Sequence, residues 1–146
     1  MAENINVIFF KDKGCWAMQD STLLPATAEN KLKAQEFLAG VVARGSSSPM
    51  AALELAVKLK PDLIFLLTDG EFEGVDQSLS NADVINFCKT KFQDGKTKIN
   101  TIAIVGDASK MQDSPEKLEY VRALQEIARN SGGIPKIVST DDVADK

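Results

Sequence analysis

The sequence LIFLLTDGEFEG, residues 63–74, places a short apolar run directly before a glycine and a cluster of acidic residues. Residues 63–67 are continuously apolar, with no alternation of polar and apolar side chains. A strand of this kind is typical of a parallel sheet that is covered on both faces. Asp69, Gly70 and Glu71 follow at the carboxyl end of the strand, where open α/β sheets bind their ligands. The stretch therefore predicts a buried strand that ends at a ligand-binding edge.

Strands and helices alternate along the rest of the chain. We expect strands over residues 5–10, 63–67, 99–105 and 137–138, and helices that begin at Thr27, Ser48, Asn81 or Asp83, and Ser114. Such alternation is the pattern of βα units on a parallel sheet. The sequence therefore predicts the α/β class, as a doubly wound, mainly parallel sheet with helices on both faces.

Three local signals refine this prediction. Thr27 is a good N-cap for the first helix, whose helical spacing continues to Gly45. Residues 11–26 are polar and contain Gly14, so they predict a loop or a short hairpin. Ser48 and Pro49 together are a typical helix start.

The composition is that of one globular domain. The chain has 146 residues, of which 44% are hydrophobic and 26% charged, so it can bury a sizeable core. We expect a single domain over residues 1–140, followed by a frayed acidic tail over residues 141–146. The net charge of −4 and the lack of a strong basic run argue against nucleic acid as a partner.

Targeting and redox signals are few. The chain begins with a polar, acidic segment and holds no run of about 18 apolar residues, so we expect neither a signal peptide nor membrane insertion. The localisation stays open, with the cytoplasm favoured. Cys15 and Cys88 lie far apart and lack CxxC spacing, which predicts two reduced structural thiols.

The chain contains no histidine, and this narrows the chemistry that it can carry. Ser-His-Asp and Cys-His nucleophilic sites and most zinc sites are excluded. Carboxylates, hydroxyls, lysines or a hard metal ion remain. Three polar segments are expected at one edge of the sheet: residues 46–48, Asp69 and Asp107. Each also has an ordinary explanation, because Ser48 can cap a helix and both aspartates can lie in turns.

The order of these segments resembles a known family. The sequence GSSSPMAALELAVKLKPDLIFLLTDGEF, residues 45–72, is similar to the central part of von Willebrand factor A (VWA) domains. In that family a Gly-Gly-Thr-x-Pro turn opens a helix, and the next strand ends in Leu-Thr-Asp-Gly-Glu. Residues 5–10 resemble the second strand of the family, and residues 124–138 resemble its closing helix and strand. The resemblance covers the chain from Ile5 to about Val138.

The resemblance implies a Rossmann-like domain that binds proteins through a metal-ion-dependent adhesion site. In the family, Mg²⁺ or Mn²⁺ is held by three loops, and a carboxylate of the partner completes the coordination. Carried over by position, Ser47 stands where the family has threonine, and Asp69 stands for the aspartate of the third loop. Ser46 and Glu71 are weaker candidates for metal ligands.

One part of the family pattern is absent. The first motif, Asp-x-Ser-x-Ser after the central strand, has no counterpart, since residues 20–22 (Asp-Ser-Thr) follow the wrong strand. The resemblance therefore implies a partial or vestigial site, with weak or absent binding of Mg²⁺ or Mn²⁺. A central strand is also missing between those expected at Ile5 and Leu63. The flanking strands could pair directly, an upstream segment could supply the strand, or a partner or a second copy could donate one.

Three functions are therefore open. The first is a protein–protein interaction module of VWA type that is not an enzyme and has no catalytic residue. The second is a Mg²⁺-dependent phosphoryl-transfer enzyme with Asp69 as nucleophile, although the chain lacks a P-loop and an Asp-x-Asp pair at a strand end. The third is a metal-free structural scaffold. Strand donation and self-association are further ways in which this chain could bind a partner.

Overall fold

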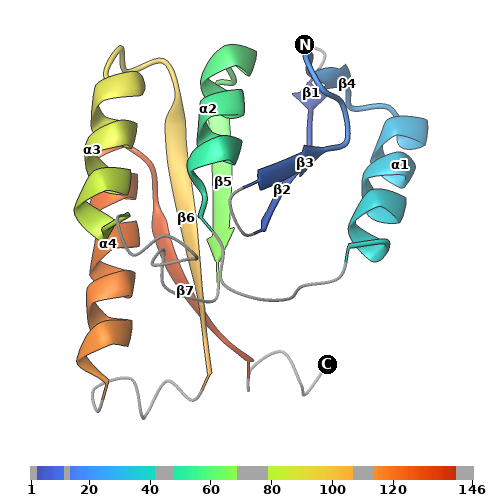
Figure 1. Cartoon of the computed structure of the whole chain (residues 1–146). Coiled ribbons are helices and arrows are strands. Elements are labelled where there is room, and N and C mark those ends of the chain that lie inside the picture. The colour runs from blue at the N-terminus through green and yellow to red at the C-terminus, as the bar shows by residue number, and fades with distance from the viewer. Residues whose placement is uncertain (1–2, 12–13, 42–47, 69–78, 107–113, 141–146) are drawn as a thin grey trace.

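The structure is a computed structural model of the chain, and it describes residues 3–11, 14–41, 48–68, 79–106 and 114–140 (Figure 1). The elements, in chain order, are β1 (Asn4–Ile5), β2 (Ile8–Lys11), β3 (Gly14–Ala17), β4 (Leu24–Pro25), α1 (Ala28–Ala39), α2 (Met50–Leu59), β5 (Leu63–Thr68), α3 (Asn81–Lys91), β6 (Lys98–Val105), α4 (Pro115–Ser131) and β7 (Pro135–Ser139). No helix of the described segments is long and apolar enough to cross a membrane.

The main sheet has the strand order β5-β6-β7, and both pairs of strands are parallel. Leu63 lies beside Lys98 at one end of the β5–β6 ladder, and Thr68 lies beside Ala103 at the other. The apolar run of residues 63–67 therefore forms a parallel strand, as its composition predicts. The α/β class is confirmed by this sheet and its connecting helices.

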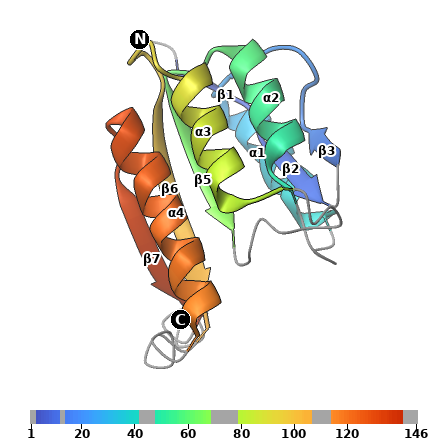
Figure 2. The ribbon, with the colours of Figure 1, turned by 60° about the vertical axis from the view of Figure 1, so that its left-hand side comes forward.

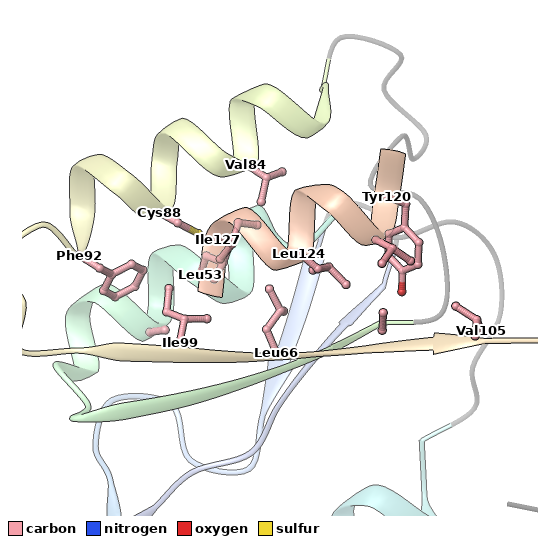
Figure 3. Packing of buried hydrophobic residues seen from close by; sticks show 13 residues of the cluster. Leu53, Leu66, Val84, Cys88, Phe92, Ile99, Val105, Tyr120, Leu124 and Ile127 are labelled. Atoms are coloured by element: carbon pink, nitrogen blue, oxygen red, sulfur yellow. The ribbon is translucent and has the colours of Figure 1, made fainter. Parts of the chain in front are cut away.

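Three helices pack on the same face of this sheet. α3 and α4 lie side by side, and α2 lies between α3 and the β2–β3 hairpin (Figure 2). Their apolar side chains meet those of β5 and β6 in one core (Figure 3), which includes Leu53, Leu66, Val84, Ile99, Leu124 and Ile127. Each of these six side chains is at most 5% exposed. Burial of this apolar surface is the main stabilising term of the fold.

The ends of the helices follow local chemistry closely. Thr27 Oγ1 accepts a hydrogen bond from the backbone N–H of Asn30 (3.2 Å), which confirms the predicted N-cap of α1. That helix ends at Ala39, earlier than the predicted stop at Gly45. Ser80 Oγ caps α3 by accepting from the backbone N–H of Asp83 (3.3 Å), so the capping box begins one residue before the predicted start.

Two consecutive glycines close α4. Gly132 has a φ of 77°, a left-handed conformation that glycine adopts without strain. A side chain at Gly133 would collide with the backbone of Ile99 in β6, so only glycine allows this close approach. The predicted stop of the fourth helix is confirmed, and it brings β7 directly back to the sheet.

The first predicted strand, residues 5–10, is divided in two. β1 pairs with β4, and β2 forms an antiparallel hairpin with β3. The division falls at Asn6, whose amide nitrogen donates to the carbonyl oxygens of Gln19 (2.7 Å) and Thr22 (3.2 Å). These bonds tie the chain to the following loop and interrupt a continuous ladder. The short hairpin predicted within residues 11–26 is present.

β2 and β5 correspond to the strands expected on either side of a missing central strand, and the described strands do not join them into one sheet. β2 and β5 belong to separate sheets, so these two strands do not pair directly with each other. α2 bridges them instead, because it contacts both the hairpin and the core. Phe10 of β2 and Met50 of α2 both pack against the core cluster. The hairpin is therefore attached to the sheet through helix packing rather than through backbone pairing.

The second face of the main sheet is the one that α3 and α4 do not cover. α1 lies beyond the hairpin and away from those helices (Figure 1). Leu63, Phe65 and Leu67 are 44%, 59% and 48% exposed. Helices on both faces, as in a doubly wound sheet, are therefore not confirmed by the described elements.

Replacing Leu124 with alanine tests the core. Leu124 is 1% exposed, so its truncation should lower the free energy of unfolding by about 2–5 kcal/mol. Leu32→Ala is the matched control, because Leu32 is 55% exposed on α1 and its loss should cost less than about 0.5 kcal/mol. Urea unfolding monitored by circular dichroism measures both. Equal losses in the two variants would contradict this core.

The two thiols should differ in reactivity. Burial raises the pKa of the Cys88 thiol to about 12, and burial followed by the Glu54 carboxylate raises the pKa of the half-buried Cys15. Both are free, and a raised pKa leaves less of the reactive thiolate near neutral pH. With DTNB at pH 8, Cys15 should react slowly in the native protein and Cys88 only after unfolding in urea. Rapid labelling of native Cys15→Ser protein would contradict the burial of Cys88.

Candidate functional site

The C-terminal edge of the main sheet is the candidate site. β5, β6 and β7 are parallel, so their carboxyl ends lie at one edge. The connecting helices run antiparallel to the strands, and the N-termini of α2 and α3 therefore return to the same edge (Figure 1). In open α/β sheets this edge is the usual place for a ligand.

The end of β5 is fixed by a tyrosine from α4. The Tyr120 hydroxyl donates a hydrogen bond to the carbonyl oxygen of Thr68, the last residue of β5. Tyr120 is only 2% exposed, and its ring packs in the core (Figure 3). A buried hydrogen bond of this kind holds the point at which the chain leaves the sheet, one residue before Asp69.

The end of β6 is fixed in a similar way. Ser139 Oγ, at the end of β7, donates to the carbonyl oxygen of Gly106 (2.8 Å). Ser139 is 8% exposed, so this bond is also largely shielded from water. Gly106 directly precedes Asp107. Two neighbouring strands thus end at anchored carbonyl groups, each followed in sequence by an aspartate.

A serine lies just before the start of α2 and bonds to its first residue. Ser48 Oγ accepts a hydrogen bond from the backbone N–H of Met50 (3.3 Å), which satisfies one of the free donors of the first turn. The N-cap position of α2 is nevertheless Pro49 and the helix begins at Met50, so the predicted N-cap at Ser48 is wrong by one residue. The serines that precede it, Ser46 and Ser47, lie outside the described residues.

The start of α3 lies at the same edge. The backbone N–H of Ser80 (2.8 Å), followed by its hydroxyl (2.7 Å), donates to Asp83 Oδ2 and holds the pKa of that carboxyl below its ordinary value. Asn81 Oδ1 is buried without a hydrogen-bond partner among the described residues. Asp83 is thus committed to the helix cap and is not available as a ligand.

The predicted metal ligands are not placed by the structure. Asp69 and Glu71, like Ser46 and Ser47, lie outside the described residues, and so does Asp107. Within the described segments, no group of three His, Cys, Asp or Glu side chains could hold a metal ion. What the structure places is the frame around these positions: the end of β5, the end of β6 and the start of α2.

Sequence patterns did not single out Tyr120 and Ser139. Tyr120 is the chain's single tyrosine and lies on the apolar face of α4, where it follows the spacing of a core residue. A lone tyrosine among buried aliphatic side chains needs a partner for its hydroxyl, and that requirement is the signal that could have identified it. Ser139 offers no comparable signal, because its partner Gly106 is far away in sequence.

In comparisons with known proteins, no family model matches the chain, and neither a curated protein nor a solved structure matches it. The similarity to VWA domains therefore rests on the sequence motifs alone.

Tyr120→Phe tests the anchor on β5. It keeps the ring but removes the hydroxyl that bonds Thr68, so stability should fall by about 0.5–1.5 kcal/mol. Hydrogen exchange followed by NMR should become faster at the amides of Leu67 and Thr68, because the strand end is less restrained.

Thr101→Val is the matched control for this change. The Thr101 hydroxyl also donates to a backbone carbonyl, that of Leu124 (2.9 Å), but in the middle of the sheet. The control should lose similar stability without faster exchange at the end of β5. The same exchange pattern in both variants would refute a local role for Tyr120.

Proposed function

We propose that this chain is a protein–protein interaction module of VWA type, with a doubly wound Rossmann-like sheet and a partial metal site. The observation that carries the proposal is the pair of anchored strand ends. Thr68 and Gly106 are held by Tyr120 and Ser139 at the edge where α2 begins. In sequence, Asp69 directly follows Thr68, and Ser46 and Ser47 shortly precede α2. This is the order in which VWA domains present two of their three metal-binding loops.

The chemistry of the donors supports a hard cation. Asp69 supplies a carboxylate, Ser47 a neutral hydroxyl oxygen, and Ser46 and Glu71 are further oxygen donors, all of the type that Mg²⁺ and Mn²⁺ prefer. Such an ion would offer an open position to a carboxylate of the partner protein. Without the Asp-x-Ser-x-Ser motif the site lacks a carboxylate and two hydroxyls, so its affinity for metal is low.

A thermal shift with Mg²⁺ and Mn²⁺ tests the metal site. Binding to the native state raises stability by mass action, by about 1.4 kcal/mol at ten times Kd. For a domain of this size, the melting temperature should rise by about 3–6 °C. The rise should be saturable at millimolar metal and absent from Asp69→Ala. Ser47→Ala should weaken it.

Asp62→Ala is the matched control. Asp62 is an exposed carboxylate immediately before β5, at the opposite end of the same strand from Asp69, and its removal should leave the metal response intact. No shift in the wild-type protein would favour the metal-free scaffold. Phosphate release from p-nitrophenyl phosphate that Asp69→Asn abolishes would favour the enzyme.

A further inference from the structure

The face of the main sheet opposite α3 and α4 has a distinct composition. Successive side chains of a strand point to opposite faces, and Ile64 and Leu66 of β5 point into the core. Leu63, Phe65 and Leu67 therefore project from the other face, where they are 44–59% exposed. Three large apolar side chains in one exposed row are unusual for an ordinary protein surface.

The neighbouring strands continue this apolar surface. The register places Ile102 of β6 beside Leu67 of β5, and Val138 of β7 beside Ile104 of β6. These three residues of β6 and β7 are only partly buried. We define the open sheet face as residues 63, 65 and 67 of β5, 98, 100, 102 and 104 of β6, and 136 and 138 of β7. Six of these nine side chains are apolar, and each of the three strands contributes at least one of them.

Two lysines supply the charge of the open sheet face. Lys98 lies beside Leu63, and Lys136 lies beside Ile102. Both are exposed, and neither makes an ion pair with a described residue. The nine positions of the face include no aspartate or glutamate. The surface is therefore apolar and positively charged, on a chain whose net charge is −4.

We propose that the open sheet face binds an amphipathic α-helix of a partner protein, with an apolar stripe against β5 and carboxylates beside Lys98 and Lys136. This inference goes beyond the proposed metal site, because it uses a different surface and needs no metal. It rests on the proposed function only in treating the chain as an interaction module.

Geometry favours a helix over an added strand. Strands lie about 4.8 Å apart, so a strand added at the free edge of β5 would be about 14 Å from β7 and would not meet Lys136. A helix about 10 Å wide on the face reaches both lysines. The row from Leu63 to Leu67 spans about 13 Å, which about nine helical residues match. Helices are also the elements that normally cover parallel sheets.

Charge argues against a second copy as the occupant. Two open sheet faces packed together would hold four lysines, and neither face has a carboxylate to pair with them. Exposed lysines at an apolar contact cost desolvation energy unless they are paired. A partner helix with glutamates at the margin of its apolar stripe removes that cost.

A fluorescein-labelled helical peptide of about four turns, with leucines along one face and glutamates beside them, is the probe. Fluorescence anisotropy in EDTA should show saturable binding. Phe65→Ser should weaken it by about tenfold, since a central aromatic side chain is the typical energetic anchor of an interface. Lys98→Glu with Lys136→Glu should weaken it by a similar factor, and so should exchanging the glutamates of the peptide for lysines.

Matched controls distinguish binding at the open sheet face from nonspecific hydrophobic or electrostatic binding. Leu32→Ser removes an equally exposed apolar side chain from α1, and Lys89→Glu with Lys117→Glu reverses two exposed lysines of α3 and α4. Both controls should bind the peptide like the wild type. Absence of saturable binding, equal binding of the lysine peptide, or equal losses in the controls would overturn the proposal.

Two other occupants of the open sheet face, a second copy of the chain and a lipid surface, can be distinguished from a partner helix by experiment. A dimer in sedimentation velocity that Phe65→Ser dissolves would assign the face to a second copy. Flotation with phosphatidylserine vesicles that the Lys98 and Lys136 variant abolishes would assign it to a lipid surface. Either result overturns the helix proposal. Because the peptide is tested in EDTA, its binding does not depend on the metal site, and failure of the metal site and failure of this face are distinguishable.

Discussion

The parallel pairing of β5 with β6 is the constraint on which the rest of the structure depends. Because Ile64 lies beside Ile99 in this register, one face of both strands becomes the floor of the core beneath α2, α3 and α4. The same register sends Leu63, Phe65 and Leu67 to the other face. It also ends the two strands at one edge, where Tyr120 bonds to the carbonyl group of Thr68 and Ser139 to that of Gly106, directly after β6. Core, open face and candidate site thus follow from one ladder.

Much of this fold could be predicted from local patterns. The uninterrupted run of residues 63–67 indicates a parallel strand, Thr27 marks the start of α1, and the pair Gly132-Gly133 marks the end of α4. These features depend on neighbours within a few residues. The break at Asn6 could not be predicted in this way, because its cause is a pair of hydrogen bonds to carbonyl groups more than ten residues away. Long-range polar contacts of this kind leave no periodic signal.

The candidate site also combines features that are predictable from local sequence with features that depend on long-range contacts. Sequence order predicts that the serines before α2 and the aspartate after β5 approach one edge, and the structure places the start of α2 and the end of β5 at that edge. The side chains that fix the edge come from elements much later in the chain. Tyr120 reaches back 52 residues to Thr68, and Ser139 reaches back 33 residues to Gly106. Motif spacing identifies candidate ligands, whereas the residues that hold their frame are found only through tertiary contacts.

The open sheet face changes the meaning of the apolar run in β5. A continuous apolar strand predicts burial on both faces, yet the helices that pack on this sheet cover only the face of Ile64 and Leu66. Fully burying a large apolar side chain is worth about 1.5–3 kcal/mol. Leu63, Phe65 and Leu67 are only 44–59% exposed, so covering them would add about half of that value for each side chain. Selection for folding alone would favour polar residues at these positions. The apolar row is therefore better explained by a structure that covers it than by the stability of the described segments.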